Sequence, residues 1–417
     1  MEDVVELAYA LDTFYFVLSG ALVMWMAAGF TMLESGLVRS KNTVEILTKN
    51  VGLYSISVIM YMVIGWNLMY ESGSGILGLL PTFSLFLPGA EPHTAEMVRA
   101  GEVSHSYYSD FFFQVVFVAT AMSIVSGAVA ERMKLWSFFI FAVVLTGFIY
   151  PIQGLWSWGG GFLDQLGFSD YAGSGIVHMA GAAAALAGVL MLGPRKGKYG
   201  SGGEIRAIPG TNMPLAALGT FILWLGWFGF NGGSELSVAS VDAANAVAKV
   251  FMNTNLAAAA GVVAALLLAR ALFGKADLTM ALNGAIAGLV SITAAPSSPS
   301  PLLASLVGAV GGLLVVLSIL ALDRLKLDDP VGAISAHGTA GIWGVLAVLL
   351  SNENATFGGQ LAGIAAIFAF VFLASLLVWA VLKWTLGIRV DEEEEVNGLD
   401  VGECGMEAYP DLTGGRA

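Results

Sequence analysis

The sequence has 417 residues, of which 57% are hydrophobic and only 12% are charged. A soluble globular domain carries about 25% charged residues, so the composition excludes that class and predicts a membrane protein with several spans. The net charge of −13 says little about those spans, because nine acids and one base after residue 390 contribute −8 of it.

Apolar runs long enough to cross a bilayer as a helix, about 20 residues each, occur eleven times along the chain. We therefore predict an all-α polytopic membrane protein with eleven transmembrane helices. The runs lie near residues 11–33, 51–70, 110–130, 135–152, 171–193, 212–231, 247–272, 278–295, 301–322, 331–350 and 357–384. An odd number of spans places the termini on opposite sides of the membrane, and the long last run predicts a tilted helix along the outside of the bundle.

Lysine and arginine are distributed unevenly over the connections, and cytoplasmic connections are normally the richer ones. The connections after odd-numbered spans contain Arg39, Lys41, Lys49, Arg132, Lys134, Arg195, Lys196, Lys198, Arg206, Lys275, Arg324 and Lys326. Those after even-numbered spans contain Arg99, and Lys249 at a span edge. The asymmetry predicts an outer N-terminus and a cytoplasmic C-terminus. It also makes 71–109 an outer loop, whose His93 and His105 we expect to be solvated.

One pattern, Asp-x-x-Gly-x-x-x-x-His, occurs twice, from Asp170 to His178 and from Asp329 to His337. Each copy begins a predicted span, and the predicted topology gives those two spans opposite directions. Eight residues of helix rise about 12 Å, so both histidines come near the middle of a hydrocarbon core about 30 Å thick. We therefore predict that the first five and the next five spans form an inverted repeat, with a functional site where the halves meet.

Two neutral imidazoles in contact can share a hydrogen bond and offer their other nitrogens to a small polar guest. The alternatives are histidines that merely satisfy backbone carbonyls, which the repeated spacing argues against, and a metal site. A metal site is disfavoured because no other histidine lies in a span and the single cysteine, Cys404, lies in the tail. Asp170 and Asp329 suit helix N-caps, and Asp170 also suits an outer cation site; the spacing alone favours the caps.

Aromatic residues gather at the expected outer ends of the spans. Trp158 precedes a run of three glycines, Phe117 lies in the third span, and the run 227–234 closes the sixth with Phe230 and Ser234. An aromatic belt at the membrane surface is one interpretation. A vestibule that holds a small cation against aromatic faces is the other, and spacing alone leaves both open.

Several of these stretches make the chain similar to the ammonium transporter (Amt/Mep/Rh) family along nearly its whole length. One departure is Cys404, where the family pattern leads us to expect histidine. The matching stretches are GLVRSKN (36–42), GAVAER (127–132), WGGG (158–161), DYAGSGIVH (170–178), WFGFNGGS (227–234), DDPVGAISAHG (328–338), and RVDEEEE (389–395), GLD (398–400) and GMEAY (405–409) in the tail.

The resemblance implies a homotrimer with one pore in each subunit, and it implies roles for particular residues. His178 and His337 correspond to the twin pore histidines, and Phe117 and Phe230 to a phenylalanine gate. Phe117, Trp158 and Ser234 correspond to an ammonium recruitment site, and Asp170 to a structural and electrostatic position behind it. For Asp329 we expect a structural and electrostatic role from its spacing, as a cap that adds negative potential at the pore mouth. The resemblance also implies a membrane domain over 1–388 and a cytoplasmic tail over 389–417 that couples subunits, with a PII-type regulatory protein as a partner.

The implied function is ammonium transport across the plasma or inner membrane for nitrogen uptake. Because a bare charge is costly in an apolar pore, ammonium would lose its proton near the gate and cross as ammonia. The alternative is an ammonium sensor on the same scaffold with little or no transport; intact pore residues favour transport, and a longer reading frame encoding a kinase or cyclase would favour sensing. Without a nucleophile–base constellation or a phosphate-binding loop, we expect no enzyme, no cofactor, no metal and no nucleic-acid partner.

Overall fold

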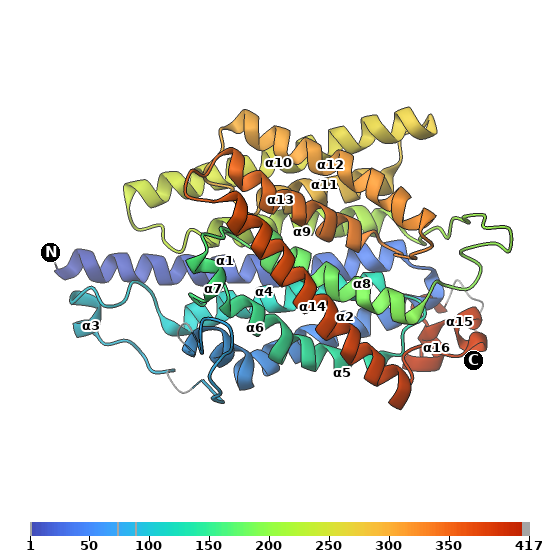
Figure 1. The fold of residues 1–417 in the computed structure, drawn as a ribbon, viewed down its shortest axis with the longest axis horizontal. Helices are drawn as coiled ribbons and strands as arrows, with labels where there is room; N and C mark the ends of the chain where they lie inside the picture. The colour runs from blue at the N-terminus through green and yellow to red at the C-terminus, as the bar shows by residue number, and fades with distance from the viewer. Residues whose placement is uncertain (1, 73–74, 88–89, 411–417) are drawn as a thin grey trace.

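The computed structural model describes residues 2–72, 75–87 and 90–410. These residues form helices joined by turns and loops, with no β-strand among them. The longer helices run roughly along the long axis of the molecule, and α1 begins at the end opposite to α15 and α16 (Figure 1). These two ends are called the N-terminal end and the C-terminal end of the bundle below.

The helices differ widely in length, and several are interrupted by π-helical turns. The α-helices are α1 (Glu2–Leu37), α2 (Thr43–Met60), α3 (Ala95–Arg99), α4 (Tyr107–Ala128), α5 (Leu135–Val144), α6 (Tyr150–Leu155), α7 (Phe162–Gln165), α8 (Ala180–Leu192), α9 (Met213–Gly233), α10 (Val241–Phe273), α11 (Leu278–Ile292), α12 (Pro301–Arg324), α13 (Ala340–Ala347), α14 (Phe357–Thr385), α15 (Glu392–Asn397) and α16 (Leu399–Cys404). The π-helical turns are η2 (Tyr61–Gly65), η3 (Asn67–Glu71), η4 (Leu145–Ile149), η5 (Ser174–Met179) and η6 (Ile334–Thr339), and η1 (Ser40–Asn42) and η7 (Val348–Leu350) are short 3₁₀ helices.

The predicted spans correspond in order to these helical stretches. In the described part of the chain, nine stretches are long and apolar enough to cross a membrane. The predicted spans at 278–295 and 331–350 correspond to the shorter apolar helices Leu278–Ile292 and Ile334–Leu350. The structure is therefore that of an all-helical polytopic membrane protein, and the count of eleven crossings stays a prediction.

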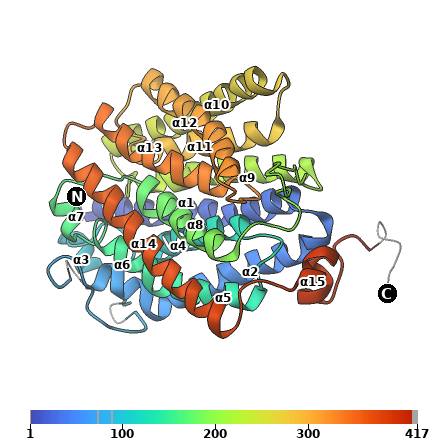
Figure 2. The same ribbon diagram turned by 45° about the vertical axis from the view of Figure 1, so that its right-hand side comes forward.

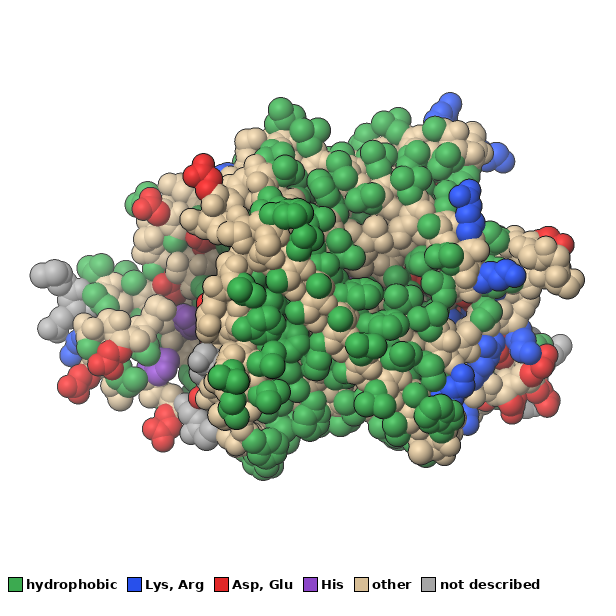
Figure 3. Space-filling view, viewed as in Figure 1, with side chains coloured by type: hydrophobic (Ala, Val, Ile, Leu, Met, Phe, Trp, Pro, Cys, Tyr) green, Lys and Arg blue, Asp and Glu red, His purple; other side chains and the backbone are tan. Residues whose placement is uncertain are grey.

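Apolar side chains cover the middle of the molecule. Figure 3 shows hydrophobic side chains over the centre of one face, while Lys and Arg gather at the C-terminal end. Helix α14 crosses the bundle obliquely and packs on α8, in the position predicted for the last apolar run (Figures 1 and 2). Its outward residues Leu377 and Trp384 are 66% and 81% exposed, which suits a surface in contact with lipid.

An ionic network joins four connections at the C-terminal end. Arg195 lies 3.1 Å from the Glu131 carboxylate and 2.8 Å from that of Asp328, and Arg39 lies 2.8 Å from Glu131. Burial opposes ionisation of Asp328, but the hydrogen bonds of Arg195 and the charges of Arg132 and Arg195 lower its pKa to about 2. The network therefore stays charged at neutral pH and fixes these connections to one another.

The tail packs on the same end of the bundle. The Asp400 carboxylate accepts the backbone N–H groups of Thr43 and Glu45 at the start of α2, at 3.1 and 2.9 Å. Arg389 pairs with Glu395 at 2.8 Å, and Glu395 in turn accepts the N–H of Lys196 at 2.7 Å. The tail is thus bound to the connection that carries Arg195.

Helices α10, α11 and α12 approach closely at several glycines, where a side chain would meet the backbone of the neighbouring helix. A methyl group on Gly308 of α12 would overlap the Ala257 carbonyl of α10, and one on Gly312 would overlap the Gly261 carbonyl. Small residues allow such approaches between membrane helices, where dispersion contacts drive association. Gly358, in the first turn of α14, has nothing within 4 Å of the same position.

We expect Gly308→Ala to destabilise the protein by about 1–3 kcal/mol, the usual cost of overpacking, because backbone must move to admit the methyl group. Gly358→Ala is the matched control and should leave stability unchanged or slightly higher, since alanine favours helix. Thermal unfolding of both purified variants, followed by intrinsic fluorescence, measures the difference. Equal melting temperatures would contradict the close packing of α10 and α12.

Candidate functional site

The two histidines of the repeated motif meet in the interior. The Nδ1 atoms of His178 and His337 are 3.2 Å apart, and the ring centroids are 5.2 Å apart at an interplanar angle of 26°. Both side chains are buried, at 0% and 2% exposure. One Nδ1 therefore donates its proton to the other, so each imidazole keeps one nitrogen outside the shared bond. Within the described residues, Nε2 of His178 has no hydrogen-bond partner.

The repeated motif places these rings by the same local device in both copies. The Asp170 carboxylate accepts the N–H groups of Gly173, Gly175 and Ile176 at 2.8–3.2 Å, at the start of η5. Gly173 has φ of 108°, a backbone conformation that glycine adopts without strain. Burial raises the pKa of Asp170 to about 6, and the backbone N–H groups act in the opposite direction.

The second copy repeats the arrangement. The Asp329 carboxylate accepts the N–H groups of Gly332 and Ile334 at 3.1 and 2.7 Å, and Gly332 has φ of 81°. Each histidine then falls within a π-helical turn, η5 or η6. Such turns are rare and are frequently found at functional sites. The Asp, Gly and His of the motif therefore serve to cap, to turn and to present an imidazole.

The two copies enter the bundle from opposite ends. α8, which follows η5, runs to the C-terminal end, where Leu192 accepts a hydrogen bond from Arg389 of the tail. α13, which follows η6, leads back to Asn352, whose amide donates to Ser169 beside the first motif. The antiparallel arrangement explains why side chains 159 positions apart can meet.

Aromatic rings stack on the His178 side of the pair. His178 lies between Trp227 and His337, with 4.9 Å between its ring centroid and that of Trp227. Phe230 lies 5.3 Å from His178, and Phe117 lies 4.0 Å from Phe230. The rings of Phe117 and Phe230 thus stand between His178 and the N-terminal end of the bundle.

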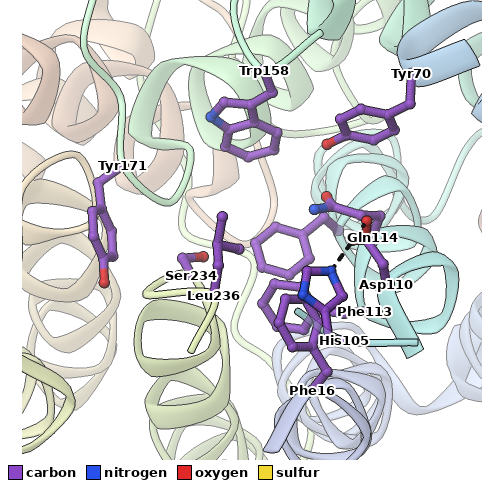
Figure 4. A pocket seen from close by; sticks show the side chains of 11 residues that line it. Phe16, Tyr70, His105, Asp110, Phe113, Gln114, Trp158, Tyr171, Ser234 and Leu236 are labelled. Carbon is purple, nitrogen blue, oxygen red and sulfur yellow. Dashed lines mark ion pairs between the residues drawn. The ribbon is translucent and has the colours of Figure 1, made fainter. Parts of the chain in front are cut away.

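A cavity of about 210 Å³ opens at that end, and Figure 4 shows side chains that line it. Phe117, Trp158 and Ser234, predicted from the family resemblance to act together, all line it. The Trp158 indole donates to the Asp170 carbonyl at 2.9 Å, which ties this wall to the first motif. The Ser234 hydroxyl donates to the Phe230 carbonyl at 2.9 Å, so its oxygen lone pairs stay available.

On the opposite side, His337 lines a small space of about 10 Å³ near Asn283 and Val331. Both of these residues also line a larger cavity of about 480 Å³, which contains Asp329 and lies at the C-terminal end. The histidine pair and the phenylalanine pair therefore separate two cavities at opposite ends of the bundle.

The sequence predicted several residues of this site and missed others. His105 was expected to be solvated, but its ring stacks on Phe16 at 4.2 Å and lines the cavity, so that expectation was wrong. The loop folds back over the end of α1, which local sequence does not reveal. Trp227 and Asp110 were also missed as site residues; the spacing of Asp110, seven residues before Phe117, is the signal that was available.

Comparison with known proteins agrees with the fold. A model of the Ammonium Transporter Family matches residues 14–409. The chain is 39% identical over 431 residues to the ammonium transporter Amt2 of Archaeoglobus fulgidus, covering 96% of this chain and 88% of that protein. Among solved structures it is similar to a sensor Amt protein (TM-score 0.88, 34% identity, 96% of this chain and 99% of that chain) and to Mep2 of Candida albicans (TM-score 0.80, 27% identity, 94% and 88%).

We expect Asp170→Ala to lower stability by about 2 kcal/mol, because three buried N–H groups lose their acceptor. Asp170→Asn keeps one carbonyl oxygen and should lie between wild type and alanine. Asp164→Ala, an exposed acid six residues earlier, is the control and should be neutral. Thermal unfolding of the three purified variants tests this. If Asp170→Ala is as stable as the Asp164→Ala control, Asp170 does not stabilise the protein by capping.

Proposed function

This chain belongs to the ammonium transporter family, and from that premise we propose that it moves ammonium or ammonia across the cell membrane. The relatives are ammonium transporters, which agrees with the expectation that the chain is not an enzyme. The observation that carries the proposal is the buried histidine pair, which stands with two phenylalanine rings between cavities at opposite ends of the bundle.

The cavity at the N-terminal end suits a small cation. Ammonium donates four hydrogen bonds, and its hydration shell can be replaced in part by a hydroxyl and by aromatic faces. Ser234 supplies the hydroxyl oxygen, and Trp158 and Phe117 supply faces that attract a cation by about 1–2 kcal/mol each. These three residues form the proposed recruitment site.

The interior suits ammonia better than ammonium. Phe117 and Phe230 form the proposed gate, and desolvating a full charge between such rings would be expensive. In our proposal ammonium loses its proton at the gate, ammonia crosses, and the pair of His178 and His337 receives or relays the proton. The imidazole pair suits that role because its shared proton leaves one N–H and one lone pair on the outer nitrogens.

The finer topology is part of the same proposal. Lys and Arg gather at the C-terminal end (Figure 3), which supports a cytoplasmic position for that end and an outer position for the 210 Å³ cavity. We further propose eleven crossings, an inverted repeat of the first ten, a membrane domain over 1–388 and a cytoplasmic tail over 389–417. The family resemblance adds a homotrimer and a PII-type regulatory partner.

A sensor is the second candidate, because one similar solved structure is that of a sensor Amt protein and this chain covers 99% of it. The same outer cavity would serve a sensor equally well, since sensing requires only that ammonium occupy it. The two functions differ in whether ammonia or ammonium crosses the gate.

Flux separates the two candidates. Purified protein in lipid vesicles, given a pulse of ammonium chloride, should produce a transient current on a supported membrane or a change in internal pH that starts several-fold faster than in empty vesicles. Both readouts are needed, because a neutral substrate carries no current. If protein-containing vesicles match empty vesicles in both current and internal pH, while the purified protein binds ammonium, the function is sensing and not transport.

We expect His178→Ala and His337→Ala each to lower the initial rate at least about ten-fold. Each variant leaves the other imidazole buried without its partner, at a cost of about 1–3 kcal/mol. His93→Ala is the matched control, because that histidine lies in the 90–106 loop and contacts Tyr9. The same vesicle assay measures all three variants. Initial rates for His178→Ala and His337→Ala equal to that of His93→Ala would show that the histidine pair takes no part in transport.

A further inference from the structure

Helix α4 presents one face to the outer cavity, and that face carries more than the gate. Asp110, Gln114 and Phe117 follow one another at spacings of four and three residues, so they lie along one side of the helix. All three line the cavity. Asp110 is about 10 Å farther from the gate along the helix axis, at 1.5 Å per residue.

Three polar groups on this side of the cavity make no hydrogen bond to a described protein side chain, although the Asp110 carboxylate lies within ion-pair distance of His105. Within the described residues, the Asp110 carboxylate, the Gln114 amide and the Tyr70 hydroxyl make no side-chain hydrogen bond. They line the same cavity, and Figure 4 shows them on the same side of it. Their oxygen atoms face a common space and can accept hydrogen bonds from a guest that enters it.

His105 closes the outer edge of this group. Its Nε2 lies 3.8 Å from the Asp110 carboxylate (Figure 4), a distance that allows an ion pair when the imidazole is protonated but is too long for a hydrogen bond. The ring is held by stacking on Phe16 at 4.2 Å, and its Nδ1 lies 3.0 Å from the Ser104 hydroxyl. The imidazole therefore bounds the space beside Asp110 without using up the acceptor capacity of the carboxylate, whose side chain is 31% exposed.

We propose that Asp110, with Gln114 and Tyr70, forms an outer capture site for ammonium that precedes the recruitment site at Trp158, Phe117 and Ser234. The proposal rests on the proposed entry of ammonium through this cavity. A carboxylate, an amide oxygen and a phenol oxygen match three of the four N–H donors of the cation. The negative charge favours ammonium over ammonia at the mouth, where the molecule is still charged.

A purely structural role for Asp110 makes a different prediction. Asp110 lies in the first turn of α4, where a carboxylate stabilises the positive end of the helix dipole. On that account, neutralising it would lower stability slightly and would leave the ammonium concentration for half-maximal rate unchanged. Kinetics therefore separates the two roles.

The test compares Asp110→Asn with Glu102→Gln, an equal charge change at an exposed residue of the loop that precedes α4. Rates in vesicles are measured against ammonium chloride at constant ionic strength, because exposed charges are screened by salt. We expect Asp110→Asn to raise KM about five-fold, as loss of a unit charge about 4 Å away in a water-like medium would. The maximal rate should stay within two-fold of wild type, and Asp110→Glu should restore KM. A KM for Asp110→Asn within two-fold of the Glu102→Gln value would overturn the proposal.

Calorimetric titration of the purified proteins with ammonium chloride keeps this proposal separate from transport itself. If wild-type vesicles show no flux but Asp110→Asn weakens binding about five-fold relative to Glu102→Gln, the capture site stands and transport falls. Equal binding by the two variants in that case would overturn the capture site as well.

Discussion

The hydrogen bond between the two buried imidazoles is the constraint on which the rest of the structure depends. An Nδ1–Nδ1 distance of 3.2 Å leaves room for a single proton between the rings. Each neutral ring has one N–H, so one ring of the pair offers a lone pair on its other nitrogen and its partner offers an N–H. Moving the shared proton and exchanging both tautomers would carry a proton from one side of the pair to the other. Two histidines in contact can thus carry protons between the cavities, and in the proposed mechanism the phenylalanine gate lets only the neutral ammonia molecule pass.

This contact needs two segments that run through the bundle in opposite directions, each carrying the same Asp-x-x-Gly-x-x-x-x-His motif. The device was predictable from sequence, because Asp, Gly and His recur at fixed spacing and apolar runs of bilayer length follow both copies. The role of the glycine follows from the structure: Gly173 and Gly332 adopt positive φ where the carboxylate of Asp170 or Asp329 accepts the N–H groups that follow. Spacing alone favoured helix capping by Asp170 and Asp329. In the structure both carboxylates accept backbone N–H groups from the first turn that follows, as an N-cap does.

Other features could not be predicted because they arise from tertiary packing. Nothing local distinguishes a π-helical turn from a regular one in the runs that contain the histidines. The stacking of Trp227 on His178 depends on α9 lying beside η5, and the position of His105 depends on a loop that folds over α1. The helix Leu278–Ile292 is short for a span, although the apolar run in the sequence continues to residue 295. Hydropathy indicates which residues are buried but does not show at which residue a helix ends. Long-range contacts therefore set the details of the site, while local patterns set its position in the chain.

The two ends of the bundle carry charge for different purposes. At the N-terminal end, the Asp110 carboxylate faces a cavity, and in our proposal its charge attracts a mobile cation. At the C-terminal end, Glu131 and Asp328 both form ion pairs with Arg195. The next residue, Lys196, donates its backbone N–H to Glu395 of the tail. Asp328 precedes Asp329, which caps the turn that holds His337. A displacement of the tail that disturbed Arg195 would therefore act on a residue adjacent to the second motif. Transport and sensing on this scaffold would share that connection, and they would differ only in whether the phenylalanine rings above His178 let the guest pass.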